Sequence, residues 1–111
     1  MNLTVGELCA ELGWTLLCGD ADRPVAGAYA CDMLSWAMAR ARSGVAWITI
    51  LNSLNVIAVA HLAEVGCVVV AENAGMAAEV LERAREKGVA VVSAPVDTCR
   101  AILLLHAAGI V

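Results

Sequence analysis

The segment VAWITILNSLNVIAVAHLAEVGCVVVA, residues 45–71, decides the fold because it predicts a strand, a loop, a helix and a second strand in succession. Val45–Leu51 is a continuous apolar run rich in β-branched and aromatic side chains, which is typical of a strand covered on both faces. Residues 54–65 predict a helix that ends at Gly66, and residues 67–72 predict another buried strand. Two buried strands joined through a helix form a parallel pair with a right-handed crossover.

Four polar residues interrupt this apolar segment: Thr49, Asn52, Ser53 and Asn55. A membrane-spanning helix needs about 20 consecutive apolar residues, and no stretch of the chain provides them. The first residues, MNLTVGELCAELG, are acidic where a secretory signal peptide is basic. We therefore expect a cytoplasmic protein without a membrane partner, in which Thr49 to Asn55 form a loop between a strand and a helix.

The composition predicts self-association. A chain of 111 residues suits a single domain, residues 1–111, and 61% of the residues are hydrophobic while only 16% are charged. The helix at 54–65 is apolar on nearly every side, and the last helix repeats this pattern at Ala101–Leu105. One small core cannot enclose two such helices, so we expect a homodimer or a higher homo-oligomer.

Charge and missing motifs exclude several functions. Eleven acidic residues against seven basic ones give a net charge of −4, which disfavours nucleic acid as a partner. The single lysine, Lys87, is not part of a phosphate-binding G-x-x-x-x-G-K-[ST] loop, and the dinucleotide motif G-x-G-x-x-G and the hydrolase motif G-x-S-x-G are absent. We expect no catalytic residue, no metal site and no cofactor.

The rest of the chain supplies further strands and helices. Residues 3–12 predict a short helix that begins with a capping box between Thr4 and Glu7. Residues 14–19 and 25–30 predict two strands that can lie side by side. Together with the parallel pair, these elements predict an α/β fold, a small single-domain sandwich with a mostly parallel sheet flanked by helices.

Three more helices complete the predicted sandwich. Asp32 can cap a helix from Met33 to Arg42, and Gly88 ends an amphipathic helix over residues 76–87. After a strand at 89–94, Asp97 or Thr98 begins a final helix that runs to about Ala108.

Helical spacing predicts which side chains face the core. In the helix at 76–87 the inward residues are Met76, Ala77, Val80, Leu81 and Ala84, and Glu79 is spaced for an ion pair with Arg83. In the helix at 54–65 the expected inward residues are Leu54, Ile57, Ala58, His61, Leu62 and Val65.

The cysteines and histidines carry no recognisable reactive motif. The five cysteines are Cys9, Cys18, Cys31, Cys67 and Cys99. Their spacing fits neither a zinc site nor a disulfide framework, so we interpret them as small buried hydrophobic residues. His61, on the packed face of a helix, and His106, on the last helix, are interpreted as satisfied or interface histidines rather than catalytic bases.

The loop from Thr49 to Asn55 is the strongest candidate for a ligand site. In a parallel α/β sheet the loops after the strands form the ligand crevice, and the following helix offers free N–H groups to an anion or a nucleotide. Asn and Ser are also ordinary helix caps, and Asp32 with Ser35 is either a polar pair facing the ligand or an N-cap with a first-turn serine. The candidate ligand-binding residues are Asp32, Ser35, Thr49, Asn52, Ser53 and Asn55.

The order of many residues resembles the DRTGG domain family. The pattern is G-x-Y-x-x-D-x-L-S, then W-I-T, then N-V-x-A-V-A, followed by a Val/Ile-rich strand. It is matched at Gly27, Tyr29, Asp32, Leu34, Ser35, Trp47, Ile48, Thr49, Asn55, Val56, Ala58, Val59 and Ala60. The similarity covers nearly the whole chain.

The resemblance implies a small α/β regulatory module. Such domains occur alone, beside CBS domains in regulated pyrophosphatases and in phosphotransacetylase-type proteins, and they are similar to the N-terminal domain of HPr kinase/phosphorylase. In these settings the domain is non-catalytic, and dimerisation and nucleotide binding are the roles it implies.

The residues that give the family its name are replaced in this chain. Counted back from Asn55, the Asp-Arg-Thr falls on Asn52, Ser53 and Leu54, and the Gly-Gly falls near Glu72 and Asn73. Loss of the arginine removes a phosphate contact, and loss of the glycines removes a close backbone approach. We expect a homodimeric regulatory or sensory module that binds a nucleotide or a small phosphorylated metabolite; the alternative is a protein–protein interaction module with no small ligand.

Overall fold

The computed structural model describes residues 3–111, and within them the chain forms five helices and five strands. The elements are, in order, α1 (Val5–Leu12), β1 (Thr15–Cys18), β2 (Gly27–Ala30), α2 (Leu34–Arg40), β3 (Val45–Thr49), α3 (Leu54–Ala63), β4 (Cys67–Val70), α4 (Ala78–Lys87), β5 (Val91–Ser93) and α5 (Thr98–Ala107).

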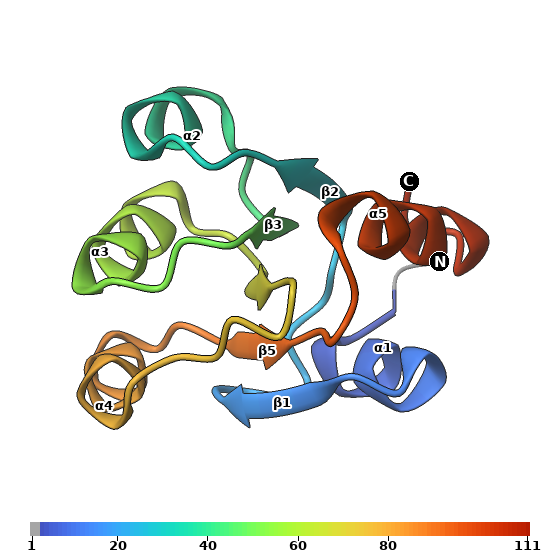
Figure 1. The fold of residues 1–111 in the computed structure, drawn as a ribbon, viewed down its shortest axis with the longest axis horizontal. Helices are drawn as coiled ribbons and strands as arrows, with labels where there is room; N and C mark the ends of the chain where they lie inside the picture. Colours follow the sequence, from blue (N-terminus) through green and yellow to red (C-terminus); the bar gives the residue numbers. More distant parts are fainter. Residues whose placement is uncertain (1–2) are drawn as a thin grey trace.

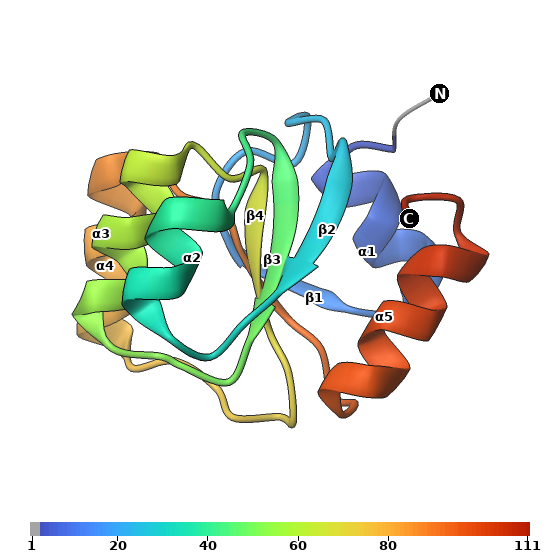
Figure 2. The same ribbon diagram turned by 90° about the horizontal axis from the view of Figure 1, so that it is seen from above.

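One mixed sheet forms the middle layer, with strand order β1-β5-β4-β3-β2. The four strands from β2 to β5 run parallel, and β1 joins β5 antiparallel at one edge. Figures 1 and 2 show α2, α3 and α4 on one face of the sheet and α1 and α5 on the other. The predicted α/β sandwich with a mostly parallel sheet is therefore confirmed.

The expected pairing of the first two strands is wrong, because β1 and β2 lie at opposite edges of the sheet. The connecting segment is held against the N-terminal segment by backbone hydrogen bonds of 2.8 Å, from the Val5 N–H to the Arg23 carbonyl and from the Val25 N–H to the Leu3 carbonyl. These bonds carry the chain past the sheet before β2 begins, so β2 pairs with β3 instead.

Strand β3 has all five residues buried, as its apolar run predicts. Ala46 and Ile48 pack in the core on the α1 and α5 side, while Val45 and Trp47 pack in the core on the side of α2, α3 and α4. The indole N–H of Trp47 donates a hydrogen bond of 3.0 Å to the Cys31 carbonyl, which satisfies the polar atom of this buried ring.

The face of α3 that packs against the core differs from the predicted face. Its buried side chains are Val56, Ile57, Val59 and Ala60. Of the residues expected to face inward, Ile57 and Val65 are buried, but Leu54, Ala58, His61 and Leu62 are exposed. Because nearly every position of this helix is apolar, its sequence holds no periodicity that distinguishes the inward face.

The helix ends combine confirmed and wrong predictions. The capping box between Thr4 and Glu7 is present at α1, and the Asp97 carboxylate caps α5 by accepting from the Arg100 N–H at 2.7 Å. Asp32, by contrast, makes no cap at α2, whose first flanking residue is Met33. Helix α4 ends as expected, with its C-cap Gly88 in the left-handed conformation.

Two further predictions about the helices are corrected. In α4, Ala77 lies exposed, and the ion pair joins Arg83 to Glu86 at 3.2 Å rather than to Glu79. Helix α3 ends at Ala63, before the expected Val65, and its C-cap Glu64 adopts the left-handed conformation with φ 56°. Gly66 is needed for another reason: a Cβ there would lie 2.6 Å from the Gly44 carbonyl oxygen.

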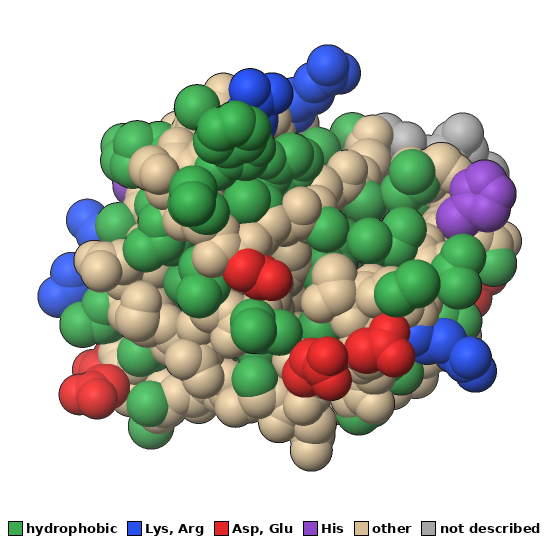
Figure 3. All heavy atoms as spheres, turned by 45° about the horizontal axis from the view of Figure 1, so that its top comes forward, with side chains coloured by type: hydrophobic (Ala, Val, Ile, Leu, Met, Phe, Trp, Pro, Cys, Tyr) green, Lys and Arg blue, Asp and Glu red, His purple; other side chains and the backbone are tan. Residues whose placement is uncertain are grey.

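Several large apolar side chains remain exposed. They are Met33, Trp36, Met38, Ile50, Leu54, Leu62, Leu103 and Val111. Figure 3 shows hydrophobic side chains gathered over the surface that α2 forms. In the described part of the chain, no helix has both the length and the apolar character needed to cross a membrane.

We predict that Gly66→Ala lowers the free energy of unfolding by about 2 kcal/mol, because the added methyl group overlaps backbone rather than a movable side chain. Gly27→Ala is the matched control, since a Cβ at Gly27 meets its nearest atom at an ordinary 3.7 Å. Urea unfolding of both variants measures the difference, and equal stability of the two would contradict the tight approach at Gly66.

Candidate functional site

Three loops meet at the carboxyl end of the parallel strands. They follow β2, β3 and β4, which are neighbours in the sheet, so the turns after them lie side by side. Asp32 stands in the first loop, residues 50–53 form the second after Thr49 ends β3, and Glu72 to Gly75 stand in the third. The sequence analysis placed its candidate site at this end of the sheet.

Asp32 and Thr49 join the first two loops through one carboxylate oxygen. The Thr49 hydroxyl donates to Asp32 Oδ1 at 2.8 Å, and the Ile50 N–H donates to the same oxygen at 2.9 Å. Thr49 Oγ1 also accepts from the Leu51 N–H at 3.1 Å, and the Thr49 side chain is completely buried. These bonds attach the loop after β3 to the segment that follows β2. We call the hydrogen bonds from Thr49 and Ile50 to Asp32 the strand clasp.

Asn52 joins the second and third loops. Its side-chain amide donates to the Gly75 carbonyl at 3.1 Å. Ser53 has the extended backbone of an N-cap residue, but its hydroxyl makes no capping hydrogen bond to α3. Asn55 lies exposed in the first turn of α3, and Ser35 lies exposed in the first turn of α2. Of the six predicted residues, Asp32, Thr49 and Asn52 hold loops together, and all six except Thr49 are exposed to solvent.

The third loop contains two residues in the left-handed conformation. Glu72 has φ 61° and Asn73 has φ 55°. The Glu72 N–H donates to the Val96 carbonyl at 2.7 Å and the Ala74 N–H donates to the Ala71 carbonyl at 3.1 Å, so the turn is held from both sides. The Gly-Gly of the resembled family falls near these positions, and glycine adopts this conformation without strain. The backbone of this chain thus adopts the left-handed conformation at both residues although neither is a glycine.

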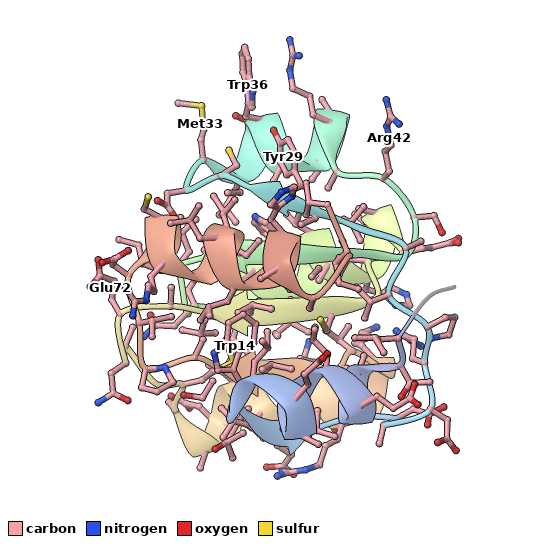
Figure 4. All side chains as sticks on the ribbon, turned by 90° about the vertical axis from the view of Figure 1, so that its right-hand side faces the viewer. Trp14, Tyr29, Met33, Trp36, Arg42 and Glu72 are labelled. Carbon is pink, nitrogen blue, oxygen red and sulfur yellow. The ribbon has the colours of Figure 1, made fainter. Side chains whose placement is uncertain are left out.

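Two of the loops at this end of the sheet carry acidic side chains. Asp32 follows β2 and Glu72 follows β4, and Figure 4 shows the Glu72 side chain projecting from this end. Two carboxylates at this end of the sheet lower the attraction of the crevice for phosphate groups. Backbone N–H groups at the start of α3 supply the opposite tendency, since a helix N-terminus favours anions.

A hollow of about 650 Å³ lies at the opposite, amino end of the strands. Its lining includes Arg23, Ser43, His61, Glu64 and Lys87. The Arg23 guanidinium donates a hydrogen bond of 3.4 Å to the Val65 carbonyl. Its positive charge therefore lies near the C-terminal end of α3. The sequence does not reveal this hollow, because its residues come from separate segments and follow no spacing that a motif would have.

The thiols and imidazoles offer no activated nucleophile or base pair in the described chain. Burial raises the pKa of the Cys67 thiol to about 12, and burial also raises the pKa of Cys9 and of Cys18. Such thiols stay protonated and unreactive at neutral pH. Cys99 lies exposed and Cys31 is only half-buried, so the interpretation of all the cysteines as buried is wrong at these two positions. His106, also exposed, has its Nδ1 atom 2.7 Å from the Val111 carbonyl oxygen.

The comparisons with known proteins agree on the kind of domain. The family model for the DRTGG domain matches residues 7–108. Among solved structures, the chain is similar to the CBS and DRTGG domains of the regulatory region of Clostridium perfringens pyrophosphatase, crystallised with the activator diadenosine tetraphosphate. The TM-score is 0.76 at 15% identity, and the match covers 93% of this chain and 46% of that chain, so this chain spans about half of that structure. No curated protein matches the sequence.

Removing the strand clasp is expected to destabilise the fold. We predict that Asp32→Ala lowers the free energy of unfolding by about 2 kcal/mol, because the Thr49 hydroxyl and the Ile50 N–H both lose their acceptor. Ser35→Ala, three residues along and exposed, is the control and is expected to change stability by less than about 0.5 kcal/mol. Chemical unfolding followed by circular dichroism measures both, and an unchanged Asp32→Ala midpoint would contradict the clasp.

Restoring glycine to the third loop is expected to stabilise the fold. Glu72→Gly relieves a left-handed backbone that a glutamate adopts only at a cost, and we predict a gain of about 1 kcal/mol. Asn73→Gly is the matched comparison and should gain less, since asparagine tolerates this conformation better. A thermal unfolding series measures the order of the two gains; a loss of stability in Glu72→Gly would show that its side chain makes a stabilising contact.

Proposed function

Because this chain belongs to the DRTGG domain family, we propose that it is a non-catalytic regulatory module that binds a nucleotide or a small phosphorylated metabolite. The crystallised neighbour is the regulatory region of a pyrophosphatase in complex with a nucleotide activator, which supports a ligand of this class. A homodimer is the proposed working state, and the cytoplasmic location stays a prediction from the sequence.

The proposed ligand site is supported by polar side chains at the start of α3 that make no hydrogen bond to the helix. The Ser53 hydroxyl makes no capping bond, and Asn55 is exposed in the first turn of the helix. A phosphate or hydroxyl group of a ligand can therefore be bound by these two side chains together with the first N–H groups of α3. In this arrangement Asp32, Thr49 and Asn52 hold the loop in position instead of contacting the ligand.

The competing function is a protein-interaction module without a small ligand. The observation that favours it is the acidic character of the loops after β2 and β4, where Asp32 and Glu72 stand. The absence of an arginine at Ser53, the position of the family's motif arginine, weakens phosphate binding further. The two functions differ in whether any nucleotide stabilises the folded chain.

A thermal-shift panel of adenine and guanine mono-, di- and polyphosphates at millimolar concentration tests the proposal. A ligand at about 100 times its dissociation constant stabilises the folded state by about 2.7 kcal/mol and raises Tm. We expect Asn55→Ala to abolish the shift of whichever nucleotide binds, because it removes a side chain of the proposed site.

Two outcomes would contradict the proposal in different ways. Lys87→Met is the control, because Lys87 lines the hollow at the opposite end of the strands. If Lys87→Met abolishes the shift and Asn55→Ala retains it, the nucleotide binds at that hollow and the α3 site is wrong. If no member of the panel raises Tm, the nucleotide proposal fails and the interaction module is favoured.

A further inference from the structure

Helix α2 leaves several large apolar side chains exposed to solvent. Among the residues of this helix only Ala37 is fully buried, while Trp36 is 50% exposed and Met38 is 51% exposed. Met33, which precedes the helix, is 58% exposed. Figure 4 shows Met33 and Trp36 pointing in the same direction, away from the sheet. Since a stable monomer rarely leaves such side chains together in water, this helix lacks a partner.

We propose that a second copy of this chain packs on α2, with the two α2 helices antiparallel about a twofold axis that passes near Trp36. The proposal rests on the self-association in the proposed function and adds the surface that mediates it. The twofold axis places the same patch of both copies in contact, as closed homodimers require.

Charge complementarity selects a second copy as the occupant of this surface. Asp32 stands just before the start of α2, whereas Arg40 ends the helix and Arg42 follows it. In an antiparallel pair the start of each helix lies beside the end of the other, so Asp32 of one copy faces Arg40 and Arg42 of its partner. The dipoles of the two helices also oppose each other in this arrangement.

Trp36 has the properties of a central contact. It lies near the middle of the span from Met33 to Arg40, so a twofold axis there brings the two indole rings together. The Arg40 guanidinium lies 4.2 Å from the centre of the indole ring and covers one of its faces. The exposed remainder of the ring is available to the partner, and tryptophan and arginine are the side chains that most often dominate interface energies.

The surface beside α2 extends the contact beyond one helix. A specific dimer buries about 800 Å² on each partner, which is more than three side chains supply. Next to α2 lies a hollow of about 470 Å³ along β2, lined by Tyr29, Arg40, Arg42 and Val111 among others. Strand β2 is the edge of the sheet, and its residues Gly27–Ala30 include no charge or proline to discourage contact. A second copy on α2 therefore also covers part of this edge.

Trp36→Glu tests the interface by placing a pair of like charges at the proposed axis. We expect sedimentation or light scattering to give a dimer for the unmodified chain at about 100 µM and a shift of at least tenfold towards monomer for the variant. Circular dichroism checks the fold, which should persist because the side chain is half exposed. Arg42→Glu should weaken the dimer as well, since it faces Asp32 of the partner with like charge.

Leu103→Glu is the matched control, because Leu103 is 59% exposed on α5, on the opposite face of the sheet. It should leave the dimer intact. A dimer that survives Trp36→Glu, or that only Leu103→Glu dissociates, overturns the α2 interface while leaving self-association standing. A chain that stays monomeric at every concentration overturns the interface and the proposed homodimer together, and the nucleotide result of the thermal-shift panel is independent of both.

Tryptophan fluorescence provides a second test with the unaltered chain. Trp14 is 6% exposed and Trp47 is fully buried, so acrylamide quenching reports mainly on Trp36. We expect quenching to fall as the protein concentration rises from about 1 to about 200 µM, because association covers this ring. Trp36→Phe should remove the concentration dependence. Quenching that is constant while light scattering shows a dimer would overturn the proposed position of Trp36.

Discussion

The burial of β3 and β4 on both faces is the constraint on which the rest of the structure depends. All residues of these two strands are enclosed, so helices must cover the sheet on both sides. Parallel strands with helical crossovers satisfy that requirement, and they bring the loops after β2, β3 and β4 to one end. The same arrangement leaves α2 at the margin of the sheet, where Ala37 is the one fully buried residue of this helix and Leu34 packs half-buried against the core.

An element is predicted correctly from the sequence where one local interaction determines its structure. The prediction fails where several packing arrangements or strand pairings would have similar energy. The capping box of α1 and the apolar run of β3 each have one satisfactory local solution, and both are confirmed. Helix α3 is apolar on every side, so only tertiary packing sets its inward face. Likewise, no pattern within β1 indicates that its partner is the distant β5 rather than the adjacent β2.

The candidate site shows the same division. Its position follows from the order of strands, and Asp32 and Thr49 meet because Ala30 lies opposite Ile48 in the register of β2 and β3. The sequence could not reveal that their side chains bond to each other, because a carboxylate near a hydroxyl suits a ligand equally well. The hollow around Arg23 and Lys87 is assembled from segments far apart in the chain, and only the fold brings them together.

The left-handed turn at Glu72 and Asn73 shows that this loop adopts a conformation that favours glycine without a glycine at either position. The hydrogen bond from the Glu72 N–H to the Val96 carbonyl holds the path from outside the turn. Relatives of this chain that lack both glycines should be recognisable by consecutive left-handed residues after the strand equivalent to β4.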